Sequence, residues 1–308
     1  MTPERKGGGK AADKAEGAPK PKRTRARRAK ATKAAKPEAR VEPEAARLEP
    51  GRVHVYSLDG KPVKTVDLPD VFRSDVRDDL IRRAVTAFQA NRRQPYGPSP
   101  KAGMRHSVRW SGKGHGVSRV PRIRGTMIGA QAPGTRGGRK AHPPRPDAIW
   151  AQKVNEQERR LARNAALAAV SDLARVQGRG HRFKEGLSLP VVIEDEIEAF
   201  APKDGAAKAG LEVLAKLGLM ADVERAKAGR HVRAGRGKMR GRRYRTPRSL
   251  LVVVKEPSKV RRTFGNLPGV EVVGPAGLNA EILAPGGHAG RLTVFSEGAL
   301  EVLRSWHA

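Results

Sequence analysis

The stretch Ser249-Leu-Leu-Val-Val-Val-Lys255 contains an unbroken apolar run from Leu250 to Val254. A run without polar alternation is typical of a parallel strand that is covered on both of its faces. Three further apolar runs are short enough to be strands of the same kind, namely Val191–Ile193, Val270–Val273 and Leu292–Phe295. Together they predict that the second half of the chain forms the parallel part of a sheet.

Helical patterns lie between these strands. The spacing of the leucine and valine side chains predicts a helix through Leu211, Val213, Leu214 and Leu217 that ends at Gly218. A short helix is expected around Ser258–Thr263, a helical turn over Leu278–Leu283, and a last helix that Ser296 begins. Because strands and helices alternate with short links, the sequence predicts an α/β fold, with a mostly parallel sheet and helices on both faces.

The first part of the folded region predicts a hairpin followed by a helix. Val53–Tyr56 and Val63–Val66 are typical of two short strands, joined by a turn at Asp59-Gly60-Lys61. Ser74 is expected to cap the helix, which has one apolar side formed by Val76, Leu80, Ile81, Ala84, Val85 and Phe88. Asp75, Asp78 and Asp79 would then lie at the positive end of its dipole.

A second helix is expected after residue 155. Asn155 and Glu158 have the spacing of a capping box, with Asn in place of the usual Ser or Thr. The helix would direct Leu161, Ala165, Leu167, Ala168 and Val170 toward a core, and Gly178 would end it.

Charge is distributed very unevenly along the chain. The 308 residues include 63 Lys and Arg against 31 Asp and Glu, a net charge of +32. Residues 1–50 hold 15 basic and 7 acidic side chains, residues 80–146 hold 15 and none, and residues 225–255 hold 12 and none. The other 160 residues hold 21 basic and 24 acidic side chains. A near-neutral body with strongly basic segments implies a polyanionic partner, since phosphate neutralisation is the usual use of such an excess.

These counts predict the domain organisation. Residues 1–50, rich in Lys, Arg, Ala and Pro, are expected to form a disordered basic tail. Residues 51–308 would form the α/β domain, interrupted by a long basic extension over 91–146 and a second basic segment over 225–248. The extension contains ten Gly and eight Pro and has neither helical nor strand periodicity. A long loop of this composition is expected to become ordered on RNA.

Basic and aromatic side chains of the two segments are the predicted RNA-binding residues. Glycines allow the backbone to approach RNA closely, and Arg and aromatic rings stack on exposed bases. Aromatic residues make up only 4% of the chain, which favours recognition of RNA shape and backbone over base stacking on aromatic platforms. The predicted residues of the extension are Arg92, Arg93, Tyr96, Lys101, Arg105, His106, Arg109, Trp110, Lys113, His115, Arg119, Arg122, Arg124, Arg136, Arg139, Lys140, His142 and Arg145. Those of the second segment are Arg233, Arg236, Lys238, Arg240, Arg242, Arg243, Tyr244 and Arg245.

The motifs of enzymes and cofactor sites are missing from the sequence. Neither a dinucleotide fingerprint, a phosphate loop, a zinc-protease motif nor a nucleophile elbow is present, and there is no cysteine. We therefore expect no cofactor, no bound metal and no small-molecule substrate. Glu194-Asp195-Glu196 follows a strand end, where α/β enzymes often place acids, but a solvated acidic loop is the more economical interpretation. No long apolar run predicts a membrane span and the N-terminus does not have the pattern of a secretory signal, so we expect a cytoplasmic protein.

Five stretches of the chain resemble one protein family. They are Arg92-Arg-Gln-Pro-Tyr-Gly-Pro-Ser-Pro-Lys-Ala-Gly-Met-Arg-His-Ser-Val108, Gly112-Lys-Gly-His-Gly-Val-Ser-Arg-Val-Pro-Arg122, Gly137-Gly-Arg-Lys-Ala-His-Pro-Pro144, Gly237-Lys-Met-Arg-Gly-Arg-Arg-Tyr244 and Asn266-Leu-Pro-Gly-Val270. They resemble the archaeal and eukaryotic type of the universal L-four family of large-ribosomal-subunit proteins. The resemblance covers roughly residues 51–308.

The resemblance implies a structural constituent of the large ribosomal subunit that is not an enzyme. It implies partners that include large-subunit ribosomal RNA and neighbouring large-subunit ribosomal proteins, and a role in subunit assembly and translation. It further implies that the extension reaches through the RNA toward the peptide exit tunnel, where its tip would lie near the nascent peptide.

Two other functions fit the residues less well. An α/β enzyme acting on RNA, such as a methyltransferase or a nuclease, would explain the fold and the charge, but the cofactor loop is absent and the acids are not clustered. An architectural protein that binds DNA would explain the charge alone. The acid-free segments rich in Gly and Pro favour a convoluted RNA surface over a uniform duplex groove.

Overall fold

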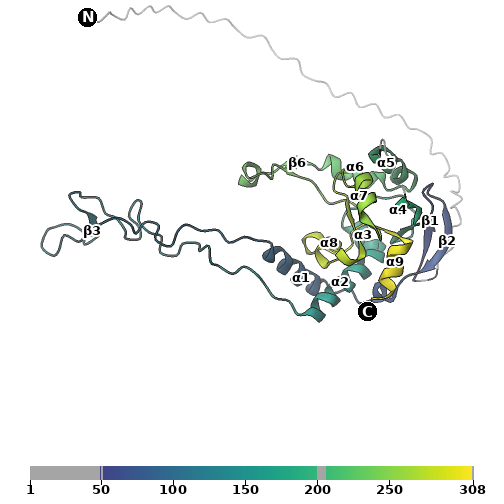
Figure 1. The fold of residues 1–308 in the computed structure, drawn as a ribbon, viewed down its shortest axis with the longest axis horizontal. Helices are drawn as coiled ribbons and strands as arrows, with labels where there is room; N and C mark the ends of the chain where they lie inside the picture. The colour runs from purple at the N-terminus through teal and green to yellow at the C-terminus, as the bar shows by residue number, and fades with distance from the viewer. Residues whose placement is uncertain (1–48, 50, 200–205, 307–308) are drawn as a thin grey trace, which may run out of the picture. The chain divides into compact units, whose positions relative to one another are not determined.

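A six-stranded sheet organises the body of the chain (Figure 1). The computed structural model describes residues 49, 51–199 and 206–306, so the expected tail over residues 1–50 lies almost entirely outside the described residues. The strand order is β2-β1-β5-β10-β8-β9, with only the β1–β2 pair antiparallel. The strands are β1 (Arg52–Tyr56), β2 (Pro62–Asp67), β5 (Val191–Ile193), β8 (Leu251–Val253), β9 (Glu271–Val273) and β10 (Thr293–Ser296).

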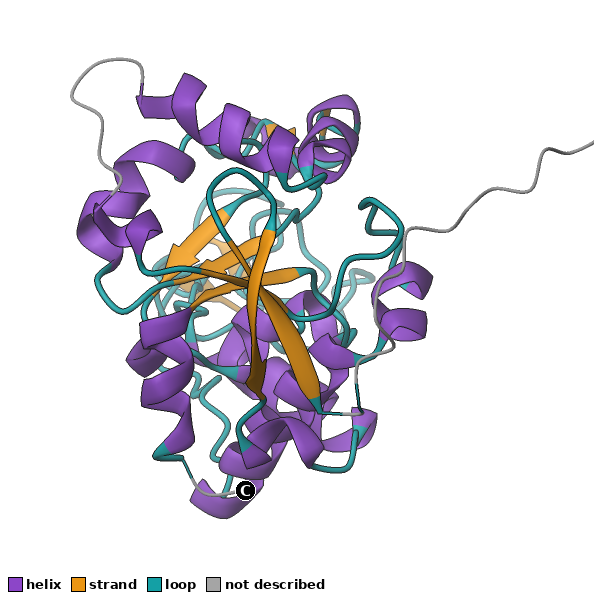
Figure 2. Ribbon diagram, turned by 90° about the vertical axis from the view of Figure 1, so that its right-hand side faces the viewer, coloured by secondary structure: helices purple, strands orange, loops and turns teal. Residues whose placement is uncertain are grey.

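Helices cover both faces of this sheet (Figure 2). The α-helices are α1 (Asp78–Asn91), α2 (Glu156–Ser171), α3 (Leu173–Gly178), α4 (Glu196–Ala199), α5 (Ala206–Lys216), α6 (Met220–Ala228), α7 (Pro257–Phe264), α8 (Ala280–Leu283) and α9 (Glu297–Arg304). Short 3-10 helices are η1 (Asp70–Arg73), η2 (Arg236–Met239), η3 (Pro275–Gly277) and η4 (Pro285–Gly287). Helices α1, α2, α8 and α9 pack on one face, whereas α5, α6 and α7 pack on the other.

Alternate residues of each central strand belong to different cores. Leu251 and Val253 of β8 pack with α1 and α2, whereas Val252 packs with α5 and α7. All three side chains are buried, because side chains alternate across a strand and each face has its own layer of helices. On β10, Phe295 packs edge-on against Phe72, with the ring centroids 5.7 Å apart. The prediction of a mostly parallel sheet within an α/β fold is confirmed.

The predicted hairpin is also confirmed. β1 and β2 pair antiparallel, and Gly60 in the turn adopts φ +78°, which a glycine adopts at little cost. A Cβ at this position would overlap the backbone carbonyl of Lys216 at the end of α5. The Lys216 ammonium donates to Asp59 at 2.6 Å, so the turn is held against the helix layer.

Two predictions about the helices of the first half are wrong. Ser74 does not cap α1, which begins at Asp78; it follows η1, whose Val71 and Phe72 are buried in the core. Asn155 is the N-cap residue of α2, but its side chain accepts no capping hydrogen bond.

The course of α2 differs in two further respects. Leu161 is 50% exposed, because α2 turns the neighbouring Ala162 and Ala165 into the core instead. The helix also stops at Ser171. Asp172 caps a separate helix, α3, and Gly178 is the last residue of α3. The expected single helix is therefore two.

The caps of the second half were predicted more accurately. The Ser296 hydroxyl accepts from the Ala299 N–H at 3.2 Å and begins α9, as expected. α5 ends at Lys216, next to Gly218 with φ +72°. Helix α6 was not predicted, since its polar residues and short length give only a weak apolar pattern.

Residues 92–155 connect α1 to α2 and contain only two short strands, β3 (Val108–Arg109) and β4 (Arg122–Ile123). The two ends of this connection are neighbours. The Asn91 side-chain oxygen accepts from the Gln152 N–H at 2.7 Å, and the Arg93 guanidinium lies 4.1 Å from the centroid of the Trp150 ring. The connection can therefore be shortened without moving α1 or α2.

Deletion of the connection tests whether the body folds without it. We expect a variant in which a short Gly-Ser linker replaces residues 94–149 to melt cooperatively and to keep mixed helix and strand content, because no residue between Arg92 and Trp150 except Ala130 is buried. Circular dichroism over a thermal ramp measures both properties. A variant that lacks a cooperative transition would show that the body needs these residues to fold.

Candidate nucleic-acid interface

The outgoing and returning halves of the 92–155 connection, its two limbs, approach each other at glycines. A Cβ at Gly97 would overlap the carbonyl oxygen of Pro144, and a Cβ at Gly103 would overlap the backbone of Gly138 and Arg139. Gly103 also adopts φ +78°. Both contacts need a backbone without a side chain, which explains two of the ten glycines of the extension.

The outer part of the connection is held by polar side chains. β3 and β4 pair antiparallel, and the carbonyl of Pro121 accepts from the Ala130 N–H at 2.9 Å. The Gln131 amide donates to the carbonyl of Met104 at 3.0 Å and to that of His106. Arg122 donates to the carbonyl of Met127 and, at 3.2 Å, to the Ser118 hydroxyl. Arg122, predicted as an RNA contact, is thus already engaged within the chain.

Most predicted cations of the connection are exposed and unpaired. Arg92 ion-pairs with Glu281 and Arg93 stacks on Trp150, so these two are tied to the body. Ten others are exposed, and none of them forms an ion pair with a carboxylate in the described part of the chain: Lys101, Arg105, Arg109, Lys113, Arg119, Arg124, Arg136, Arg139, Lys140 and Arg145. Tyr96 is 86% exposed and Trp110 45%, and the imidazoles of His106, His115 and His142 are exposed beside them.

The second basic segment forms a smaller excursion. β6 (His231–Val232) pairs antiparallel with β7 (Tyr244–Arg245), and η2 lies between them. The Arg230 guanidinium lies 4.5 Å from the centroid of the Tyr244 ring, and Arg243 lies 5.8 Å from it. The cations that are exposed and without a carboxylate partner among the described residues are Arg236, Lys238, Arg240, Arg242, Arg243 and Arg245. Arg233 is half-buried, and its backbone N–H donates to the Arg243 carbonyl at 2.9 Å.

Each segment is thus held together by its own strand pair. In the described residues, no hydrogen bond or ion pair joins the extension to the second segment. The two sets of cations therefore lie on separate structural elements, each of which keeps its positive charges close together without neutralising them.

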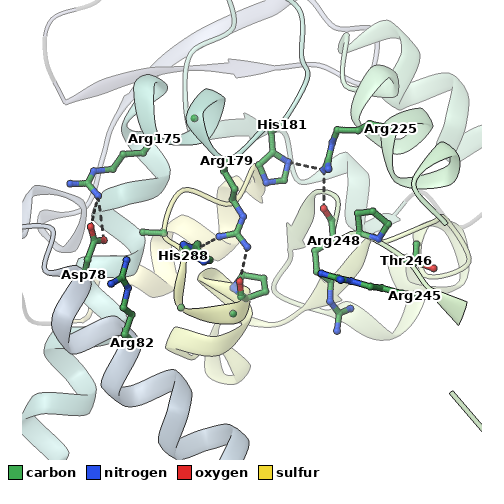
Figure 3. Close-up of a pocket in the computed structure, with 16 residues that line it drawn as sticks. Asp78, Arg82, Arg175, Arg179, His181, Arg225, Arg245, Thr246, Arg248 and His288 are labelled. Atoms are coloured by element: carbon green, nitrogen blue, oxygen red, sulfur yellow. Dashed lines mark hydrogen bonds and ion pairs between the residues drawn. The ribbon is translucent and has the colours of Figure 1, made fainter. Parts of the chain in front are cut away.

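A third basic feature lies where the parallel strands begin. A cleft of about 810 Å³ opens between α1, α3, η4 and the residues that precede β8 (Figure 3). Asp78 is the one carboxylate that lines it, and six arginines line it as well: Arg82, Arg175, Arg179, Arg225, Arg245 and Arg248. Enzymes of this fold class bind their ligands at the opposite edge, beyond the carboxyl ends of the strands.

A buried polar network forms one wall of the cleft. Both Asp222 oxygens lie 3.1 Å from His181 Nδ1, and the same carboxylate accepts from Arg225 Nε at 2.9 Å and from the Ser249 hydroxyl at 2.8 Å. Burial alone would raise the Asp222 pKa, but the hydrogen bonds from His181, Arg225 and Ser249 outweigh it, so this pKa is well below its ordinary value. Burial lowers the pKa of His181 and outweighs the opposing effect of Asp222.

Arg291 lies behind this wall, fully buried. It donates through Nε to the carbonyl of Ser249 at 3.0 Å, and through a terminal nitrogen to Glu271 at 2.6 Å and to the carbonyl of Ile282 at 2.8 Å. Burial lowers its pKa, and the Glu271 carboxylate opposes that shift. The residue ties the starts of β8, β9 and β10 to helix α8.

Of the acidic residues after β5, Asp195 and Glu198 have structural partners. Asp195 accepts from the Gly298 N–H at 2.7 Å, at the first turn of α9. Its neighbour Glu198 accepts from the Lys255 N–H at 2.6 Å and from the Ser296 hydroxyl at 2.7 Å, which links β8 to β10. In the residues that the structure describes, no three His, Asp or Glu side chains gather as metal ligands would. These acids fix the carboxyl edge of the sheet rather than forming a catalytic pair.

Comparison with known proteins places these features in a family. The model of the ribosomal protein L4/L1 family matches residues 66–306. A relative from Methanopyrus kandleri, the large ribosomal subunit protein uL4, is 50% identical over 81% of this chain and 96% of its own length. The uL4 proteins of Thermoplasma acidophilum and Archaeoglobus fulgidus are each 45% identical, over 82% and 83% of this chain and 97% and 99% of their own lengths.

The chain belongs to the ribosomal protein L4/L1 family. The resemblance found in the sequence is therefore confirmed, including its archaeal character. Members of this family are structural proteins of the ribosome and not enzymes, so the alternative of a methyltransferase or nuclease was wrong. Among the described residues, none of the helices is both long and apolar enough to span a membrane.

Five of the six arginines of the cleft were not among the residues that the sequence predicted, the exception being Arg245. Arg82, Arg175 and Arg179 lie on helices α1 and α3 or directly after them, where a single basic residue carries no signal of its own. Arg225 and Arg248 fall at the ends of the second basic segment, but nothing in their spacing distinguishes them. Only the fold brings these residues together.

A glycine substitution tests the close contact between the two limbs. Gly103→Ala should broaden the distance distribution between spin labels at residues 99 and 141, because the new Cβ overlaps the backbone of Gly138. Pulsed electron paramagnetic resonance measures this distribution, and the absence of cysteine allows two unique labels. Gly114→Ala is the matched control, since Gly114 has a similar φ of +86° but nothing within 4 Å. Equal broadening in both variants would contradict the contact.

The buried histidine predicts how stability depends on pH. Because burial lowers the His181 pKa below 6.5, the unfolded chain binds a proton in the range where the folded chain does not. Stability should therefore fall as the pH drops from 7 through about 6.5 toward 5. The lowered pKa of Asp222 acts in the same direction, but only below its ordinary value of 3.8.

His181→Asn should reduce this loss of melting temperature between pH 7 and pH 5. The Asn amide still donates to Asp222 from the position of Nδ1 but does not titrate. His142→Asn, at an exposed position, should leave the pH dependence as in the parent chain. If the melting temperature of the His181→Asn variant fell with pH as steeply as that of the parent, another group would have to account for the loss.

Proposed function

We propose that this chain binds large-subunit ribosomal RNA through the extension 91–146 and the second basic segment 225–248. In this role it is a constituent of the cytoplasmic large ribosomal subunit that supports subunit assembly and translation. The observation that carries the proposal is the charge of these segments, since most of their exposed cations, with Arg92 and Arg248 as exceptions, have no carboxylate partner among the described residues. Holding so many like charges together is unfavourable unless a polyanion neutralises them.

The shape of the two segments supports RNA rather than a DNA groove. Their backbone is mostly irregular, with short two-residue strand pairs and glycines at the closest approaches. Such a backbone follows an irregular surface of phosphates and exposed bases, whereas a uniform groove is usually filled by a helix or a β-ribbon. Exposed Tyr96, Trp110 and Tyr244 give each segment at least one ring for stacking.

The far end of the extension is proposed to reach toward the peptide exit tunnel. Met127 and Ile128 near Arg124 are 66% and 60% exposed, so apolar side chains are available there for a nascent peptide. The near-neutral body is proposed to contact neighbouring ribosomal proteins. Residues 1–50 would add a basic arm that contacts phosphate, although this segment lies almost entirely outside the described residues.

Salt dependence of RNA binding tests the proposal. Each phosphate contact contributes roughly 0.7 to 0.9 to the slope of log affinity against log salt concentration. Changing Arg240, Arg242 and Arg243 to Ala should therefore flatten the slope by about two to three and impair incorporation into large subunits. Filter binding to large-subunit ribosomal RNA and sedimentation of tagged chains with subunits measure the two effects.

A control triple removes the same charge from the body. Arg52, Arg77 and Arg160 are exposed arginines that each pair with a carboxylate, so their change to Ala should alter the slope much less. If the two triples flattened the slope equally, net charge alone would explain binding. The assignment of the second segment as a contact surface would then fail.

A further inference from the structure

The arginine-lined cleft contains a half-buried cation without a carboxylate partner among the described residues. Arg179 donates to the backbone carbonyls of His288 and Pro285, the latter at 2.8 Å, but to no carboxylate among the described residues. Burial, with the nearby charges of Arg291 and Arg225, lowers its pKa to about 10. A half-buried guanidinium that has only carbonyl partners is partly desolvated without an opposite charge to offset that cost. An anion in the cleft would supply that charge.

His181 forms part of the wall of the cleft. Its side chain is 1% exposed, and its Nδ1 lies 3.1 Å from the Asp222 carboxylate. The other ring nitrogen, Nε2, is buried and has no hydrogen-bond partner among the described residues. Because Nδ1 donates to Asp222 and burial favours the neutral ring, Nε2 is an acceptor that a hydroxyl of a ligand, and not a phosphate oxygen, would satisfy. Figure 3 shows the His181 ring between Arg179 and Arg225.

Two further arginines are available at the cleft. Arg82 comes from α1 and Arg245 from β7, and both are exposed and line the cleft. Neither has an ion pair with a described carboxylate. By contrast Arg175 pairs with Asp78, and Arg248 pairs with Glu271. The cleft therefore offers Arg82, Arg179 and Arg245 to an incoming anion, on a frame that the other pairs hold in place.

We propose that this cleft binds a phosphate group of the RNA backbone, held by Arg82, Arg179 and Arg245. A phosphodiester fits because its oxygens accept from several guanidinium groups at once, and arginine is the side chain best suited to such contacts. The inference rests on the proposed function, since it takes RNA as the source of the phosphate. It adds a site on the folded body to the two basic segments.

Inorganic phosphate tests the cleft itself. Phosphate at constant ionic strength should raise the melting temperature of the full chain, because an anion that binds only the folded state stabilises it. Arg82→Gln with Arg245→Gln should raise the half-saturating phosphate concentration at least about tenfold, since two charge-assisted contacts are lost. The control is Arg262→Gln with Arg304→Gln. It removes the same charge from exposed body positions that have no carboxylate partner among the described residues and do not line the cleft, and it should respond like the parent. A phosphate response that is equal in both double variants would overturn the proposal.

Ribosomal RNA tests the source of the phosphate. Modification of arginines by phenylglyoxal, read residue by residue by mass spectrometry, should show that a large-subunit RNA fragment protects Arg82 and Arg245. If RNA protected Arg240, Arg242 and Arg243 but left Arg82 and Arg245 reactive, the cleft inference would fail while the proposed function stood. Protection of neither set would count against both. Protection of the cleft by inorganic phosphate alone would show that it does not bind the RNA backbone.

Discussion

Repulsion between unpaired cations is the constraint on which the arrangement of this chain depends. Nearly half of the basic residues of the chain fall in two stretches, 80–146 and 225–255, that contain no acid at all. Outside α1, α6 and β8, these stretches cannot fold into a core of their own, because they have few apolar residues and no internal counter-charge. The body is therefore built from these three elements and the remaining, nearly neutral residues. Uncharged interactions hold the basic stretches in place. They are the backbone hydrogen bonds of the β3–β4 and β6–β7 pairs and the close backbone contacts at Gly97 and Gly103.

The amino edge of the sheet shows how the body accommodates cations. Arg291 is fully buried and Asp222 is fully buried, yet each is held by several hydrogen bonds, so that neither charge is left isolated. Ser249 connects the two, since its carbonyl accepts from Arg291 and its hydroxyl donates to Asp222. This network fixes the backbone just before β8 and therefore the position from which residues 245–248 enter the cleft. At the carboxyl edge Asp195 and Glu198 perform the corresponding task for α9, β8 and β10.

The sequence predicts the sheet well because the signals there are local. Leu250–Val254 is apolar without a break since both faces of β8 are covered, and Ser296 caps α9 through a contact only three residues away. Where the deciding contact is distant, prediction fails. Ser74 has the chemistry of a cap, but it ends η1, whose Phe72 packs on Phe295 of β10, and α1 begins only at Asp78. The basic segments were predictable from composition, whereas the cleft depends on residues from Asp78 to Ala289 that no periodicity connects.

The basic segments and the cleft differ in the conformational entropy that is lost when RNA binds them. The cations of the extension lie on an irregular backbone, so RNA that binds them must also fix side chains and loop conformation, and this opposes binding. The cleft is different, because its arginines project from α1, α3 and a backbone already held by Arg291 and Asp222. A contact on a rigid frame loses less conformational entropy per hydrogen bond, and its geometry selects one position of the phosphate. A rigid site on the body would therefore set the register, after which the adaptable segments follow the RNA surface. The two surfaces would then contribute to different properties of the complex, the cleft to orientation and the segments to most of the salt-dependent affinity.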